Sequence, residues 1–286
     1  MRTLRLQYPL TLLCRVLEVS RSGYYAWQHR RPSKRAQENA RLEVAIQAAH
    51  VRTRHTYGPE RLQAELREDG CPAGIGRIKR LRTKLGLRCT QVRRFTLTTD
   101  SAHRLPVADN LLAQTFTATR PNETWVTDIT YIATTEGWLY LAGIKDLYTC
   151  EVVGHAMGAR MTTDLVSHAL VRAVVAKRPR PGLIHHSDRG SQYCAQDYQD
   201  QLRQFGLTPS MSRKGNCYDN APMESFWGTL KNELVHHRRY ATREQARREI
   251  TEYIELFYNR QRRHSRLGNC SPAAFAQQWA RQQPAA

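Results

Sequence analysis

The residue composition and hydropathy pattern of the chain change at residue 125, and this change limits its fold more than any other feature. Three consecutive stretches there are rich in β-branched and aromatic residues and partly alternate in hydropathy, as strands do. A stretch with apolar residues at helical spacing, a short apolar stretch and a second helical pattern follow. Three strands, a helix, a strand and a helix predict a mixed sheet with helices packed on it, an α/β core. We expect strands at 125–132, 138–146, 152–157 and 182–187, a helix at 163–177 capped by Thr163, and a helix at 195–204.

The part of the chain before residue 91 is predicted to be helical. Helical spacing resumes near Glu38, a second helix begins at Pro59 and ends before Gly70, and a third covers residues 75–85. The third helix has one apolar stripe and basic residues over the rest of its surface. Two short helices with a glycine-containing connection, the second strongly basic, are typical of a helix-turn-helix that reads the major groove. A solvated basic face on an ordinary helix hairpin is the alternative. The expected DNA contacts are Arg77, Arg80 and Lys84.

These patterns divide the chain into five segments. The expected segments are an N-terminal helical segment at 1–36, a helix-turn-helix-like domain at 37–90, a linker at 91–118, the catalytic core at 119–240 and a basic helical extension at 241–286.

The positive charge is placed unevenly along the 286 residues. The net charge of +19 divides into +13 over residues 1–118, zero over 119–235 and +6 over 236–286. Arginine supplies most of the excess, and its planar fork can donate two hydrogen bonds to one phosphate. The basic flanks therefore indicate a polyanionic partner. A soluble protein that is basic without such a partner is the alternative.

Other features of the composition exclude several classes of protein. The seven cysteines are an odd number without a C-x-x-C pair, which argues against a disulfide framework and a structural zinc. No stretch approaches the roughly 18 consecutive apolar residues of a membrane span, and the N-terminus has no apolar signal segment. We expect a cytoplasmic, nucleoid-associated bacterial protein with no membrane partner.

Three acidic residues stand out by their positions in this pattern. Asp128 lies in the middle of the first expected strand, where burying a carboxylate is costly without a cation or hydrogen-bond donors. Asp188 closes the strand at 182–187, and Glu224 lies in the first turn of a helix introduced by Asn220-Ala221-Pro222. Thirty-five residues separate Asp188 from Glu224, and Lys231 follows two helical turns later on the same face. Taken singly, each acid could be a cap or a surface residue.

Together the three acids suit phosphoryl transfer to DNA. This chemistry uses two divalent ions roughly 4 Å apart, one at the attacking oxygen and one at the leaving oxygen. Convergent carboxylates without thiolates suit Mg²⁺ or Mn²⁺. His185 and His186 precede Asp188, but packing or hydrogen bonding in the strand is the preferred interpretation because Mg²⁺ avoids imidazole.

The segments WVTDITYI, HHSDRGSQY and NCYDNAPMESFWGTLKNEL resemble those of transposases in the retroviral-integrase superfamily. The resemblance is to the OrfB-type subunit of copy-out-paste-in insertion sequences. It extends to HTYGPERLQAELREDG from His55 and to YNRQRRHSRLGNCSPAAF from Tyr258, so it covers most of the chain. It implies an RNase H-like core in which Asp128, Asp188 and Glu224 hold two metal ions. It also implies that Lys231 contacts the transposon end and that Arg189 belongs to a turn framing the site.

The activity implied is metal-dependent cleavage at transposon 3′ ends followed by strand transfer, with terminal inverted repeats and target DNA as substrates. An RNase H-like nuclease that cuts without joining is one alternative. A catalytically dead DNA-binding regulator is another, although such a protein has no physical reason to keep three costly carboxylates together.

We also expect this chain to work with a protein from an upstream reading frame or as a fusion with it, and as a homo-oligomer. Leu12 to Tyr25 has too few apolar residues to fold alone, and no heptad pattern is visible. OrfB-type relatives receive an oligomerisation segment from such a partner.

The charge distribution generates a prediction about DNA binding by residues 1 to about 100. Binding should weaken steeply with salt, with a log–log slope of about −0.9 for each phosphate neutralised. Charge reversal at Arg77, Arg80 and Lys84 together should weaken binding in a titration of labelled duplex. A flat salt response, or unchanged binding by the triple variant, would remove the recognition-helix interpretation.

Overall fold

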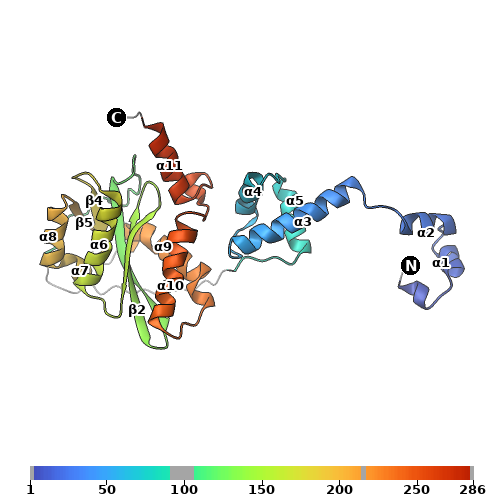
Figure 1. Cartoon of the computed structure of the whole chain (residues 1–286), viewed down its shortest axis with the longest axis horizontal. Coiled ribbons are helices and arrows are strands. Elements are labelled where there is room, and N and C mark those ends of the chain that lie inside the picture. Colours follow the sequence, from blue (N-terminus) through green and yellow to red (C-terminus); the bar gives the residue numbers. More distant parts are fainter. Residues whose placement is uncertain (1–2, 91–105, 214–216, 284–286) are drawn as a thin grey trace.

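The computed structural model describes residues 3–90, 106–213 and 217–283, so residues 91–105 of the expected linker lie outside it. Figure 1 shows a sheet covered by helices, a three-helix unit beside it and a small N-terminal helical segment further away.

A five-stranded mixed sheet forms the core of the fold. Its strand order is β3-β2-β1-β4-β5, with β1, β2 and β3 antiparallel and β4 and β5 parallel to β1. This order places β1 at the centre. The four expected strands are present, and a fifth strand, β5, which was not among them, pairs at the sheet edge. The strands are β1 Thr124–Thr134, β2 Gly137–Asp146, β3 Val152–Gly158, β4 Ile184–Ser187 and β5 Thr208–Met211.

The two faces of the sheet pack against different helices. Alternate residues of a strand point to opposite faces, so Trp125 of β1 and Ile144 of β2 join the cluster beneath α6 and α8. Val126 and Leu141 join the cluster beneath α9 and α10. The helices around the sheet are α6 Thr163–Lys177, α7 Ser191–Cys194, α8 Gln196–Gln204, α9 Ala221–Glu233 and α10 Arg243–Glu252.

Helix α6 corrects one detail of the sequence interpretation. Thr163 is its first residue rather than its cap, and the capping residue Thr162 makes no side-chain hydrogen bond to the helix. Packing instead holds the helix close to the sheet. A Cβ on Gly154 of β3 would lie 2.5 Å from the carbonyl oxygen of Ala169, so only glycine allows this approach.

Three helices form the unit beside the sheet. The second and third follow the sequence signals closely, whereas the first begins at Lys34, before the expected start near Glu38, because Ser33 caps it. Pro59 opens the middle helix as its first residue, and Gly70 follows its end with a positive φ of 74°. The apolar stripes of the three helices meet in a core that includes Ile46, Leu62 and Ile78. The helices are α3 Lys34–Arg52, α4 Pro59–Glu68 and α5 Ile75–Lys84.

The two ends of the described chain are also helical. The N-terminal segment buries few apolar side chains, and Leu6 and Val16 are largely exposed. After α10 the chain continues directly into a π-helical turn, η4, whose Tyr253, Phe257 and Tyr258 are buried. The elements at the ends are η1 Leu4–Leu6, α1 Leu10–Val16 and α2 Arg21–Gln28, then η4 Tyr253–Tyr258, η5 Ser265–Leu267 and α11 Pro272–Gln282, with short turns η2 Cys217–Asn220 and η3 Val235–His237 beside α9.

None of the helices in the described part of the chain is both long enough and apolar enough to cross a membrane.

Candidate active site

Asp128 lies at the middle of β1, on the face that α9 covers. Its Oδ2 accepts a hydrogen bond of 3.0 Å from the indole Nε1–H of Trp227 on α9. Burial and the negative charge of Asp188, with a smaller contribution from Glu224, raise the pKa of Asp128 to about 8. The structure therefore brings Asp128 within electrostatic range of both other candidate acids.

The close approach of Trp227 depends on Gly143. Gly143 is the register partner of Asp128 on the neighbouring strand β2. A Cβ at this position would lie 2.7 Å from Cη2 of Trp227, so a side chain would push the indole away. The missing side chain opens the space that the indole fills beside Asp128.

Asp188 follows the last residue of β4, which runs parallel to β1. Val126 pairs with His186, so two residues further along both strands Asp128 and Asp188 come to the same level. The Asp188 carboxylate accepts a hydrogen bond of 2.9 Å from the backbone N–H of Gly190, which shapes the turn. Arg189 in that turn donates from Nε to the Ser212 carbonyl oxygen at 2.6 Å.

Glu224 is exposed in the first turn of α9, where the sequence placed it. The part of its carboxyl group that the surrounding chain shields from water is enough to raise its pKa above the usual value. The buried Lys145 of β2 donates from Nζ to the Pro222 carbonyl oxygen at 3.2 Å, which fixes the start of α9 on the sheet. Two hydrogen bonds, one made by Lys145 and one by Trp227, therefore set the position of this helix on the sheet.

Three acids thus lie on one side of the central strand, contributed by β1, the end of β4 and α9. Among the residues that the structure describes, no three His, Cys, Asp or Glu side chains are arranged as a formed metal site. The available donors are carboxylate oxygens, the ligands that Mg²⁺ and Mn²⁺ prefer.

The two histidines before Asp188 are hydrogen-bonded within the fold, as the sequence favoured. His185 Nε2 lies 2.8 Å from the Tyr198 hydroxyl, and His186 lies between the hydroxyls of Ser210 and Ser212. Burial lowers the pKa of His185 to about 3 and that of His186 to about 4, so both rings stay neutral at neutral pH.

Lys231 belongs to α9, as Glu224 does, and lies within electrostatic range of Asp128 on β1. Its ammonium is 5.1 Å from the centre of the Tyr131 ring on β1. Burial lowers the pKa of Lys231, and the charge of Asp128 opposes this shift.

The three candidate DNA contacts on α5 belong to the three-helix unit rather than to the candidate active site, and they differ in the residues that they contact. Arg77 contacts Asn39 and Glu38, and Lys84 forms a 2.6 Å ion pair with Glu43, so both reach back to α3. Arg80 donates only weakly, at 3.4 Å, to the Gly76 carbonyl oxygen of its own helix.

Asp219 is a buried carboxylate that the sequence interpretation overlooked. It accepts hydrogen bonds from Arg213, Asn110 and Gln114, and the contact with Arg213 is the main reason that its pKa is strongly lowered. The adjacent Asn220 donates to the Thr127 carbonyl oxygen of β1 at 3.0 Å. Both anchor the chain just before α9, and their only sequence signal was their place beside the Pro222 helix start.

Comparison with known proteins identifies the family of this chain. Two family models described as an integrase core domain match residues 118–217 and 205–272, and one described as an HTH-like domain matches residues 36–95. The chain is 62% identical over 267 residues to the uncharacterized 31 kDa protein of insertion element IS600 from Shigella sonnei, spanning 93% of this chain and 98% of that protein. It is 45% identical over 272 residues to the transposase InsF of insertion sequence IS3A from Escherichia coli strain K12, spanning 94% of each. The chain belongs to the IS3 family of transposases.

Two of the solved structures to which this transposase is similar are a viral intasome chain and an integrase core domain. A chain of the simian T-cell lymphotropic virus intasome is 15% identical with a TM-score of 0.49, over 78% of the transposase and 71% of that chain. The catalytic core domain of BIV integrase is 16% identical with a TM-score of 0.44, over 56% of the transposase and 97% of that chain. The family assignment rests on the sequence relatives and family models.

Substituting Gly143 should disturb the transposase site through Trp227. We expect Gly143→Ala to cost roughly 1–3 kcal/mol of unfolding free energy, typical of overpacking, and to displace the indole from Asp128. Denaturant unfolding followed by tryptophan fluorescence measures both effects. Gly228→Ala on α9, the helix that carries Trp227, is the control, because its Cβ would meet nothing within 4 Å and alanine favours helix. Equal stability of the two variants would contradict the close contact.

Asp219→Asn should remove a pH-dependent part of the stability of the transposase. Because the pKa of Asp219 is lowered in the folded state, its stabilisation is present above the unfolded pKa of about 3.9 and is lost as pH falls toward the folded pKa. We expect the variant to lose roughly 2 kcal/mol at pH 7 and progressively less as pH falls from 4 to 2. Unfolding curves between pH 2 and pH 7, with the exposed Asp200→Asn as control, test this. A deficit independent of pH would assign Asp219 a packing role instead.

Proposed function

We propose that this transposase cuts DNA at the 3′ ends of its insertion sequence and joins each freed 3′-OH to a second phosphodiester, with Asp128, Asp188 and Glu224 as the catalytic acids. The observation that carries the proposal is geometric: the parallel strands β1 and β4 bring Asp128 and Asp188 to the same level, and Trp227 fastens α9, which carries Glu224, over Asp128. Like-charged carboxylates are kept together at a cost that a bound cation would offset.

The three carboxylates fit two divalent ions, Mg²⁺ or Mn²⁺, because they offer hard oxygen ligands without thiolates and gather negative charge. When bound, such ions activate the attacking oxygen and stabilise the leaving oxygen of an in-line displacement at phosphorus. Asp128 and Asp188 would share the ions, and Glu224 would complete the second site.

Other residues would hold the DNA. Lys231 lies beside Asp128 on the face of α9 that also carries Glu224, and its ammonium would meet a phosphate of the transposon end. Arg189 in the turn after Asp188 would support the same strand. Arg80, with Arg77 and Lys84, would bind the terminal inverted repeat through α5 and leave the core to engage target DNA.

We further propose that the transposase is divided into five segments, 1–36, 37–90, 91–118, 119–240 and 241–286. It would act as a homo-oligomer, in the cytoplasm and at the nucleoid. A protein from an upstream reading frame, or a fusion with it, would supply the pairing of two transposon ends. The exposed apolar residues of α1 and α2 are consistent with such a partner.

The catalytic assignment is tested by three substitutions that remove charge and preserve shape. Asp128→Asn, Asp188→Asn and Glu224→Gln should each abolish Mg²⁺- or Mn²⁺-dependent joining of a labelled end-repeat duplex, a loss of about a hundredfold or more. A variant that retains near wild-type joining would exclude its residue from the trio. Cleavage without any joined product in the wild type would favour a nuclease.

Two further variants are measured in the same assay, the first as a control and the second as a test of Lys231. Asp197→Asn changes an acid of α8 outside the site and should join like the wild type. Lys231→Ala should weaken end binding while leaving the affinity for Mn²⁺, measured by calorimetry, unchanged. Equal losses of both affinities would make Lys231 a structural partner of the carboxylates.

A further inference from the structure

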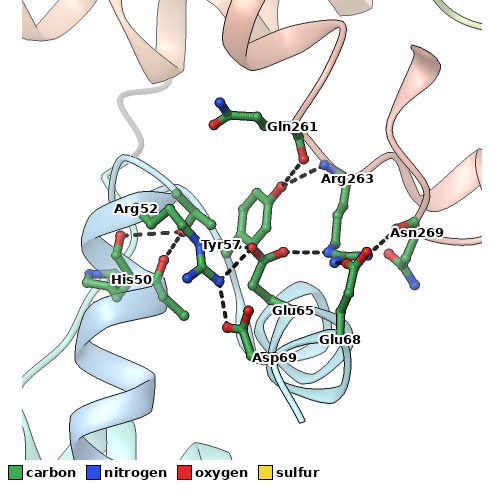
Figure 2. Close-up of polar contacts among 11 residues, drawn as sticks. His50, Arg52, Tyr57, Glu65, Glu68, Asp69, Gln261, Arg263 and Asn269 are labelled. Carbon is green, nitrogen blue, oxygen red and sulfur yellow. Dashed lines mark hydrogen bonds and ion pairs between the residues drawn. The ribbon is translucent and has the colours of Figure 1, made fainter. Parts of the chain in front are cut away.

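The three-helix unit is fastened to the segment that follows α10. The hydroxyl of the fully buried Tyr57, just before α4, donates to the Gln261 carbonyl oxygen at 3.3 Å and accepts from the backbone N–H of Arg263 at 2.6 Å. Figure 2 shows this hydroxyl between the two parts of the molecule. Residues about two hundred positions apart in sequence therefore share one buried hydrogen-bonding group.

The side chain of Arg263 makes the strongest polar link between these parts. Its Nε donates to Glu65 at 2.6 Å, one terminal nitrogen donates to Glu68, and the other donates to the Asn269 carbonyl oxygen at 2.9 Å (Figure 2). Arg52 holds the other oxygen of Glu65 at 2.9 Å. The side chains of Arg263 and Glu65 are only 14% and 15% exposed, so this pair is largely removed from water.

A second buried ion pair connects the same segment to α9. Arg262 donates from Nε and a terminal nitrogen to the two oxygens of Glu233 at 2.8 and 2.7 Å, and both side chains are 6% exposed. Tyr253 of η4 donates to Glu233 at 2.7 Å, and Arg61 of α4 lies 4.0 Å from it. Glu233 is the last residue of the helix whose first turn carries Glu224.

Apolar packing accompanies these polar links. The buried side chains of the three-helix unit belong to the same hydrophobic cluster as those of α9, α10 and η4. At its edge, Arg54 lies over the Phe257 ring at 5.0 Å and pairs with Glu252 at 2.7 Å.

The energetics of these contacts show what they can do. A buried charge that loses its partner costs several kcal/mol, so Arg262 and Arg263 are tolerated only while their carboxylate partners remain in place. The guanidinium group of Arg262 is hydrogen-bonded to a carboxylate of α9, and that of Arg263 to a carboxylate of α4. Bidentate arginine contacts also fix direction, because both hydrogen bonds must align at once.

We propose that Arg262 and Arg263 form an arginine brace that holds the three-helix unit in one orientation on the core, and that Arg263 is thereby a positioning residue for strand joining. This inference rests on the proposed function. The DNA end held by the three-helix unit reaches the acids only in the orientation that the brace fixes. A misplacement of about 1 Å can lower a reaction rate about a hundredfold without changing any reacting group.

The test uses the full-length chain and a duplex carrying the terminal inverted repeat that flanks the gene. Arg263→Glu places a third carboxylate against Glu65 and Glu68 and should lower the joining rate at saturating duplex by about tenfold or more. The Kd for the duplex should match that of Arg260→Glu, the control. Arg260 is an exposed arginine of the same segment, so the two variants change the net charge equally.

Hydrogen exchange supplies a readout that does not depend on activity. In Arg263→Glu, peptides covering residues 53–70 and 258–269 should lose protection while β1 keeps it, because only the contacts between the two parts are broken. Tyr57→Phe removes a single hydroxyl and should cause a smaller loss in the same peptides. In the double variant Arg263→Glu/Glu68→Arg the charges are exchanged, and both protection and joining should partly return.

The inference is overturned if Arg263→Glu joins and exchanges like Arg260→Glu, or if the double variant restores neither property. It is also overturned if the Kd for the duplex rises in proportion to the loss of joining, because Arg263 would then be a DNA contact. Absence of metal-dependent joining by the wild type would instead refute the proposed function.

Discussion

The half-buried carboxylate of Asp128 is the constraint around which the core is arranged. Burial, the charge of Asp188 and, more weakly, that of Glu224 raise its pKa to about 8, because a charged carboxylate is unfavourable in a medium of low dielectric constant. The Trp227 indole hydrogen bond partly offsets this cost, and the bare surface of Gly143 makes room for the indole. Because Trp227 belongs to α9, the group that stabilises Asp128 also fixes the helix that carries Glu224.

Long, strongly patterned elements could be predicted from the sequence, and tertiary contacts could not. The strands β1 to β3 and the helices α4 and α6 begin and end within about two residues of their expected positions, because apolar periodicity extends over their whole length. Strand β5 has only four residues and contains Pro209, which an edge strand tolerates but which gives no strand signal. The Trp227–Gly143 contact joins residues 84 positions apart, so no local pattern could indicate it.

The roles of the arginine residues were the hardest to predict from the sequence. The excess of +6 over residues 236–286 suggested a surface for a polyanion, but Arg262 and Arg263 are buried in ion pairs with Glu233 and Glu65, so that interpretation does not hold for these two. The planar fork of a guanidinium fits a carboxylate as well as a phosphate, so composition alone cannot distinguish the two uses. Arg77 and Lys84 show the same ambiguity, since both contact acidic residues of α3.

The helix α9 is fixed at its two ends by different parts of the molecule. At its start, Lys145 holds Pro222 and Asn220 holds Thr127, contacts that lie wholly within the core. At its end, Glu233 contacts Arg262, with Arg61 of the three-helix unit nearby. The two ends are about 18 Å apart along a helix of this length, so the contacts with the three-helix unit act on the end of α9 that lies away from Glu224. Under the proposed function, loss of the contacts at Glu233 would change the direction from which DNA approaches the acids, while the contacts of Lys145 and Asn220 would still hold the start of α9 on the sheet.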